Sequence, residues 1–232
     1  MGLKESGLRG SLRNVSVGID AIPDSVVTRH DSTEEPEIGS ITTAEDVIAE
    51  FDLTGSCEVI DDGINGLRTY RLDGSNDDLE NTDITVTEEP FAVLLLARLP
   101  NPPSDDSNHY FDAVDSDGNA RSVSFQADFE GQHQIIRGQD PSTKADDQDG
   151  DPHVWILKGT DNNRLTLEKD GSDVIDEELS EGDIHSMLLG NESDGGRRLE
   201  FDFVEHEIME GYTQDELDSE RQRLADKGGI SL

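Results

Sequence analysis

Oxygen-bearing side chains at alternate positions mark one segment as a candidate cation site. The segment is DAVDSDGNAR, and its candidate ligands are Asp112, Asp115, Asp117 and Asn119. This spacing matches the first half of a calcium-binding loop, because calcium takes carboxylate and amide oxygens. The second half does not match, because Ala120 replaces the glycine of an EF-hand loop and Gln126 its bidentate glutamate. We therefore interpret the segment as a β-hairpin turn, with calcium as the alternative and with no cofactor required.

A second set of side chains could bind sugars. Sugar sites combine an aromatic ring that stacks on the sugar face with planar polar groups that bond its hydroxyls. Some candidates are aromatic side chains with polar atoms, and others lie in the polar loop 137–152, which has the length of a functional or mobile loop. They are His109, Tyr110, His133, Asp140 and Asp151. The single tryptophan, Trp155, lies in a predicted strand and is interpreted as a core residue.

Glycoside hydrolysis requires a pair of carboxyl groups. Retaining glycosidases hold two carboxyl groups about 5 to 5.5 Å apart, and alternate residues of one strand can supply them. The pattern E-x-D-x-E occurs at Glu216, Asp218 and Glu220, in a predicted helix, where positions i and i+2 do not share a face. Zinc, P-loop and nucleophile-elbow patterns are missing from the sequence. We predict no catalytic residues and no enzyme.

Strand patterns dominate the chain from residue 53 onward, with turn signals between them. Residues 123–128 and 199–203 alternate apolar and polar side chains, as half-buried strands do. The segment from Phe91 to Ala97 is apolar on both faces, which predicts a central strand covered on both sides, by the N-terminal arm or a neighbouring subunit. Thr213 and Glu216 form a capping box that opens a final helix, and Thr42 to Phe51 is predicted as a short helix.

Six segments in order resemble those of concanavalin A-like lectin and laminin G-like jelly-roll domains. They are DDGINGLRTYRLDGSNDDL, PFAVLLLARLP, HYFDAVDSDGNARSVSFQ, HVWILKGTDNNRLTLEKDG, LLGNESDGGRRLEFDFVEHEIM and YTQDELDSERQRLADKGGI, which together cover about 53–230. The resemblance implies an all-β antiparallel jelly-roll sandwich with a short C-terminal helix. We divide the chain into an N-terminal arm and linker, 1–40, and this domain, 41–232.

Composition suggests the setting in which the protein works. The 232 residues carry 54 acidic and 18 basic side chains, a formal net charge of −36. Molar salt would screen this repulsion, because the Debye length is then about 3 Å. The acidic, lysine-poor chain resembles proteins of extreme halophiles. Nucleic acid is disfavoured as a partner without a basic face, and no apolar run is long enough for membrane insertion.

The first thirty residues are the only locally basic region. Leu3, Leu8, Leu12 and Arg13 are interpreted as a docking arm, and the alternative is a frayed terminus with a capping strand. The segment IPDSVVTRH that follows resembles one that precedes such domains in proteins of haloarchaea and their viruses. The start of the chain lacks the apolar core of a secretion signal, which favours synthesis in the host cytoplasm.

Two function classes follow from these features. The first is a virion surface protein of a halophilic archaeal virus, such as a capsid turret, spike or tail-fibre module. It would form homo-oligomers, contact other virion proteins, and attach to a host surface glycan or S-layer glycoprotein. The second is a free or cell-associated, non-catalytic glycan-binding protein of a haloarchaeon. Sugar binding rests on fold analogy in both classes.

Overall fold

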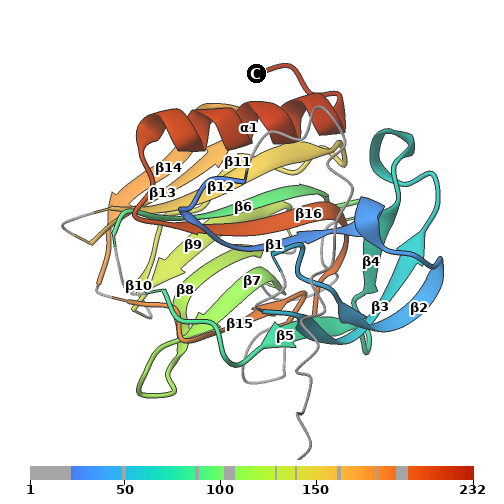
Figure 1. The fold of residues 1–232 in the computed structure, drawn as a ribbon. Helices are drawn as coiled ribbons and strands as arrows, with labels where there is room; N and C mark the ends of the chain where they lie inside the picture. Colours follow the sequence, from blue (N-terminus) through green and yellow to red (C-terminus); the bar gives the residue numbers. More distant parts are fainter. Residues whose placement is uncertain are drawn as a thin grey trace, which may run out of the picture.

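The computed structural model describes residues 22–48, 51–86, 89–101, 108–128, 130–138, 140–160, 163–180, 182–191 and 198–232. Two layers of antiparallel strands pack face to face, and one helix, α1 (Gln214–Gly228), lies on the outside of the first layer (Figure 1). The predicted antiparallel jelly-roll sandwich with a C-terminal helix is therefore confirmed. The docking-arm residues Leu3, Leu8, Leu12 and Arg13 lie outside the described ranges.

The layer beneath the helix is built around β16, the longest strand. Its members are β1 (Val26–Asp31), β4 (Thr69–Asp73), β6 (Phe91–Arg98), β12 (His153–Thr160), β13 (Arg164–Lys169), β14 (Ser172–Glu178) and β16 (Glu200–Glu210). β16 pairs with β6 along one edge and with β4 and then β1 along the other. From β6 the layer continues through β12 and β13 to β14.

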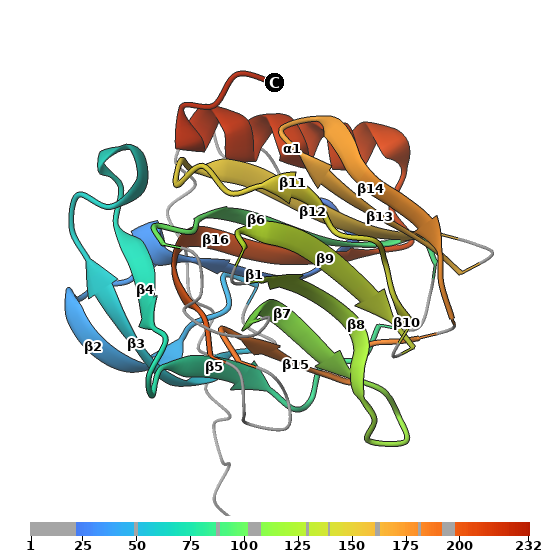
Figure 2. The same ribbon diagram turned by 180° about the vertical axis from the view of Figure 1, so that it is seen from behind.

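The second layer is seen most clearly from behind (Figure 2). Its strands are β2 (Gly39–Ala44), β3 (Leu53–Ile60), β5 (Asp78–Asn81), β7 (Asn108–Val114), β8 (Ala120–Ala127), β9 (Gln132–Arg137), β10 (Asp140–Pro141), β11 (Ala145–Asp147) and β15 (Ser186–Leu189). β3 pairs with both β4 and β5, so hydrogen bonding runs from one layer into the other at this edge. Residue 40, where we placed the end of the N-terminal arm and linker, lies within β2. Both β2 and β1 pair with strands of the sandwich. Two short 3-10 turns complete the elements, η1 (Ser32–Glu34) and η2 (Ile64–Gly66).

Two apolar clusters hold the three layers together. Alternation along β6 sends Phe91, Val93 and Leu95 into the larger cluster between the two strand layers. Ala92, Leu94 and Leu96 face the other way and pack in a smaller cluster with α1. The outer face of β6 is thus covered chiefly by the chain's own helix. The N-terminal segment contributes to this cover as expected, because Val26 and Ile22 pack in the same cluster, whereas the helix was not among the expected covers. This strand therefore gives no argument for an oligomer.

One local expectation is wrong in the part that the structure describes. Thr42 to Ala44 complete β2 and do not begin a helix. The carboxylate of Asp46 accepts hydrogen bonds from the backbone N–H groups of Arg29 at 3.0 Å, Ile48 at 2.9 Å and Phe51 at 3.1 Å. These bonds satisfy the backbone without helical ones, because an aspartate can bond nearby N–H groups in turns.

Candidate functional site

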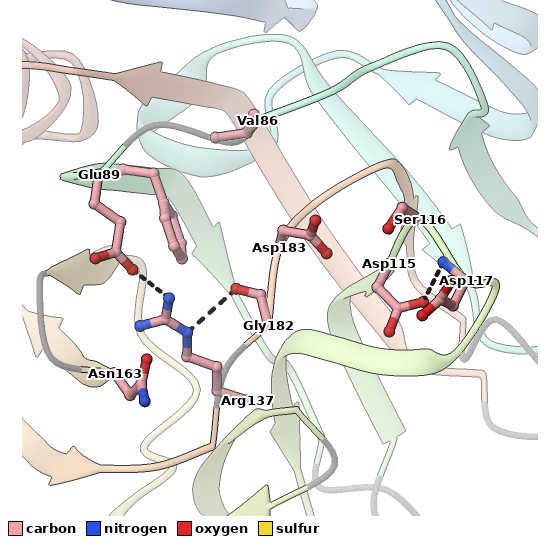
Figure 3. A pocket seen from close by; sticks show the side chains of 10 residues that line it. Val86, Glu89, Asp115, Ser116, Asp117, Arg137, Asn163, Gly182 and Asp183 are labelled. Carbon is pink, nitrogen blue, oxygen red and sulfur yellow. Dashed lines mark hydrogen bonds and ion pairs between the residues drawn. The ribbon is translucent and has the colours of Figure 1, made fainter.

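A hollow of about 590 Å³ opens where connections from both layers meet at one end of the sandwich (Figure 3). We call it the end pocket, and its volume is in the range of small-molecule sites, roughly 300 to 1,000 Å³. It is lined by Val86, Glu89, Phe91, Asp115, Ser116, Asp117, Arg137, Asn163, Gly182 and Asp183. These residues come from five stretches of the chain. The stretches are the β5–β6 connection with the first residue of β6, the β7–β8 turn, the last residue of β9, the β12–β13 connection and the β14–β15 connection.

Arg137 holds the inner wall of the end pocket together. Its Nη2 is ion-paired with the Glu89 carboxylate, and its Nε donates to the carbonyl oxygen of Gly182 at 3.3 Å. The guanidinium carbon lies 5.6 Å from the centre of the Phe91 ring, within cation–π range. The side chain is only 5% exposed. Arg137 therefore ties three of the five stretches to one point.

Gly182 permits this close approach. A Cβ atom at this position would lie 2.1 Å from the carbonyl oxygen of Ser122 and 2.9 Å from the backbone nitrogen of Gly138. Neither backbone atom can move without disturbing the hydrogen bond from Gly138 N–H to Ser122 O, which is 2.8 Å long. The wall of the pocket thus needs glycine for steric reasons.

The β7–β8 turn supplies the opposite side of the end pocket. The Asp115 carboxylate accepts bonds from the backbone N–H groups of Asp117 at 2.9 Å and Asn119 at 2.8 Å, and from Asn119 Nδ2 at 2.8 Å. Slight burial opposes ionisation, but these bonds outweigh it and lower the pKa of Asp115. Asp115 is therefore a fixed negative charge that also shapes the turn.

The predicted calcium ligands are not assembled into one site. Asp112 is fully buried on β7, with its Oδ1 3.7 Å from His109 Nδ1, whereas Asp115, Asp117 and Asn119 form the hairpin turn. Among the described residues, no group of three or more His, Cys, Asp or Glu side chains is placed to hold a metal ion. The segment joins the paired strands β7 and β8 through a turn, which is the geometry of a β-hairpin.

Three of the five predicted glycan residues meet at a second, much smaller hollow beside Trp155. Tyr110, His133 and Asp151 line it. Tyr110 Oη lies 3.2 Å from His133 Nε2, and both side chains are about 1% exposed. Trp155 is 3% exposed, and its ring centre lies 4.5 Å from that of His133. These rings form part of the core between the layers and present no open stacking surface.

Residues 148–151, which we call the strap, close this hollow. Gln148 Nε2 donates to Leu99 O at 2.5 Å, and the Asp149 carboxylate binds His153 Nε2 at 2.8 Å and Lys169 Nζ at 3.2 Å. Partial burial opposes ionisation of Asp149, but its bonds and the nearby positive charges lower its pKa to about 2. His153 also bonds Asp170 at 2.6 Å, and the two carboxylates raise its pKa against the effect of burial.

The other two predicted glycan residues lie elsewhere. His109 is fully buried on β7, where Ser124 Oγ is 2.8 Å from its Nδ1. Asp140 is exposed on the two-residue strand β10 and accepts a long bond of 3.4 Å from Ser180 Oγ. Neither side chain lines the hollow beside Trp155 or the end pocket.

The carboxylates of the E-x-D-x-E pattern have structural partners on α1. Glu216 closes the capping box with Thr213, and Asp218 is ion-paired with Arg221 at 2.6 Å. Glu220 is buried and binds Arg29 at 2.8 Å and Arg223 at 2.5 Å. The pattern therefore stabilises the helix and its contact with the sheet.

Comparisons with known proteins match at the level of structure. No protein family matches the chain, and no curated protein matches its sequence. A sialidase of Trypanosoma rangeli superposes with a TM-score of 0.67 at 12% identity, over 89% of this chain and 34% of that one. The ligand-binding domain of botulinum neurotoxin serotype D in complex with N-acetylneuraminic acid superposes with a TM-score of 0.61 at 9% identity, over 86% and 51%.

The fold is a lectin-like β-sandwich. A binding domain of botulinum neurotoxin DC in complex with SialylT shares it, with a TM-score of 0.62 at 10% identity, over 87% of this chain and 51% of that one. At such low identities the likeness concerns the fold alone. This chain spans about a third of the sialidase chains and half of the toxin chains.

The comparisons correct one prediction. We predicted that the chain is not an enzyme, but the fold occurs within chains of sialidases, which are enzymes. One of these structures holds 2,3-difluorosialic acid as a covalent intermediate, with a TM-score of 0.67 at 13% identity. A lectin-like sandwich is therefore no ground for excluding enzymes.

Proposed function

We propose that the chain binds glycans and that the end pocket is the binding site. The observation that carries this proposal is the pocket itself, which combines a suitable volume with convergent polar groups on a rigid β-scaffold. Proteins that share the fold were solved with sialic-acid ligands, which supports sugar binding as the class of function.

The lining suits hydroxyl groups. Asp183 and Asp117 offer carboxylate oxygens as acceptors, and the Asn163 amide offers both a donor and an acceptor. Phe91 lies in the wall behind these groups, 3% exposed and with the Arg137 guanidinium over its ring, so polar contacts would carry the binding. A sugar presents hydroxyl groups that complement these acceptors and donors.

Binding to a glycan array in molar salt tests the proposal. We expect the intact chain to bind a subset of glycans. Asp183→Ala and Asn163→Ala should each weaken binding about tenfold or more, because a lost hydrogen bond in a binding site costs about 1 to 3 kcal/mol. Asp226→Ala on the exposed side of α1 is the matched control and should bind normally. Pocket variants that bind as well as the control, or an array on which nothing binds, would refute the proposal.

The hollow beside Trp155 is the second candidate location, because Tyr110, His133 and Asp151 do meet there. A sugar would reach these rings after the strap moved away. Replacing Asp149 by Ala removes the contacts to His153 and Lys169 that hold the strap. Stronger glycan binding by this variant would favour the hollow, and unchanged binding would favour the end pocket.

We also propose that the protein works in molar salt on the virion surface of a halophilic archaeal virus. The acidic, lysine-poor composition and the resemblance of IPDSVVTRH to segments in proteins of haloarchaea and their viruses support this proposal. Homo-oligomers, other virion proteins, and a host surface glycan or S-layer glycoprotein are the partners that this setting implies. Mass spectrometry and immunogold labelling of particles purified from a halophilic culture test this placement. Stoichiometric labelling of the particle surface is the expected result, and absence from purified particles would argue for the free haloarchaeal glycan-binding protein.

A further inference from the structure

We propose that the end pocket takes uncharged sugars and rejects anionic ones, sialic acid included. The inference rests on the proposed glycan-binding function and defines the class of ligand. It separates this chain from proteins of the same fold that were solved with sialic-acid ligands. Two features of the described lining lead to it: the engagement of Arg137 and the excess of carboxylates.

Recognition of a sugar carboxylate usually requires a cation that can offer two parallel N–H groups. Arg137 is the one cationic side chain among the described residues that line the end pocket. Its Nη2 is paired with Glu89, its Nε donates to Gly182 O, and its Nη1 lies 3.5 Å from Arg164 O. The guanidinium charge is therefore already neutralised, and its donors are directed into the pocket wall.

The remaining charged groups of the pocket are all negative. Asp115 is held ionised by the bonds of its turn, and Asp117 is exposed. The Asp183 side chain is 39% exposed, and its Oδ2 lies 3.2 Å from Nε2 of His185, which is outside the lining. Figure 3 shows Asp183 between the Arg137 wall and the turn that carries Asp115 and Asp117. Together with Glu89, the described lining contains four carboxylates and one guanidinium. An anionic sugar would be repelled here, whereas neutral hydroxyl groups would find acceptors.

The test is a glycan array that carries neutral oligosaccharides beside their sialylated derivatives, read at 0.2 M and at 3 M KCl. We expect the neutral member of a pair to bind at least tenfold more tightly at 0.2 M, and the difference to shrink at 3 M, where charge repulsion is screened. Equal or tighter binding of the sialylated members at low salt would overturn the inference and leave the proposed function standing. Binding of neither member would overturn both.

A matched pair of variants separates charge from shape. Asp117→Asn with Asp183→Asn removes two charges and keeps acceptor oxygens, so we expect the preference for neutral members to fall several-fold at 0.2 M. Asp61→Asn with Asp226→Asn removes two charges from exposed positions. Asp226 lies on α1, two residues before Gly228. Gly228 is close to Leu96, which lies towards the end of β6 that is distant from the pocket residue Phe91. This control should keep the preference, and an equal loss in both double variants would overturn the pocket as its source.

Discussion

Glu205 and Glu207 lie on the same face of β16, yet their surroundings shift their pKa values in opposite directions. Burial disfavours the ionised form of both. Hydrogen bonds and charges from Arg223 and Lys227 outweigh it at Glu205 and lower that pKa. At Glu207 burial prevails over Arg29 and Arg223 and raises the pKa to about 7. Glu207 Oε1 has no hydrogen-bond partner in the described part of the chain, and Oε2 accepts from Arg29 Nε at 2.6 Å and Arg223 Nη2 at 3.0 Å. A neutral side chain that keeps one acceptor oxygen can retain these bonds.

Substitution by glutamine should therefore distinguish the two positions. Glu205→Gln removes a charge that binds Arg223 at 2.5 Å and Lys227 at 2.8 Å, so we expect it to lower the free energy of unfolding by about 3 kcal/mol. Glu207→Gln resembles the protonated acid and should cost about 1 kcal/mol or less. Denaturant unfolding at pH 7 measures both. A larger loss in Glu207→Gln would contradict this account.

The raised pKa of Glu207 also predicts a pH dependence. Its ordinary value is 4.5, so between about pH 4.5 and 7 the native state binds a proton that the unfolded state has released. The contribution of this group to stability is present below pH 4.5 and is lost as the pH rises through 7. Comparing unfolding of the intact chain and Glu207→Gln over this range isolates it. Parallel pH profiles of the two proteins would show that Glu207 does not titrate there.

At the scale of elements, α1 acts as the outer cover of the first strand layer. Leu224 is fully buried in the cluster that contains Leu94 and Leu96, and Gln222 on the same helix is exposed. Leu224→Ala should lower the free energy of unfolding by about 2 to 5 kcal/mol, because it leaves a cavity. Gln222→Ala should change it by about 0.5 kcal/mol or less. Similar losses in the two variants would contradict a covering role for the helix.

Much of the fold could be predicted because strand alternation, the order of the six segments and the capping box at Thr213 are local signals. The cover of β6 could not, because Leu224 and Leu94 are 130 positions apart. Asn65 shows the same limit. An Asn-Gly pair favours a tight turn, but only the structure shows that Asn65 Nδ2 donates to the carbonyl oxygen of Lys227 at the end of α1, at 3.0 Å.

The candidate site was harder to predict for the same reason. Arg137 binds Glu89 and Gly182, which lie 48 and 45 positions away in the chain, and no short motif joins them. Tyr110 and His133 are candidates because they are aromatic side chains with polar atoms. Their alignment with Phe125 and Trp155 between the layers buries them, which the residue types alone do not reveal.

At the scale of the whole molecule, the main feature is the large negative net charge. A net charge of −36 predicts self-repulsion that salt relieves. We expect the melting temperature to rise by about 10 °C between 0.1 M and 3 M KCl, which for a domain of this size corresponds to a few kcal/mol. Sucrose at the same osmolality should reproduce only a small part of the rise. A melting temperature that stays level or falls with salt would contradict the proposed halophilic setting.

No helix in the described ranges is long and apolar enough to cross a lipid bilayer. The molecule instead offers a rigid sandwich with connections from both layers gathered at one end. Two hollows are candidates for ligand contact: the end pocket, which is open, and the hollow beside Trp155, which the strap closes. The first of these is the proposed sugar-binding site.

The most direct test is a crystal structure of the chain with the neutral glycan that binds best on the array, grown in molar salt. We expect sugar density in the end pocket, with hydroxyl groups within hydrogen-bond distance of Asp183 and Asn163 and the strap unmoved. Sugar seated against Trp155 after the strap has opened, or bound outside both hollows, would contradict this proposal.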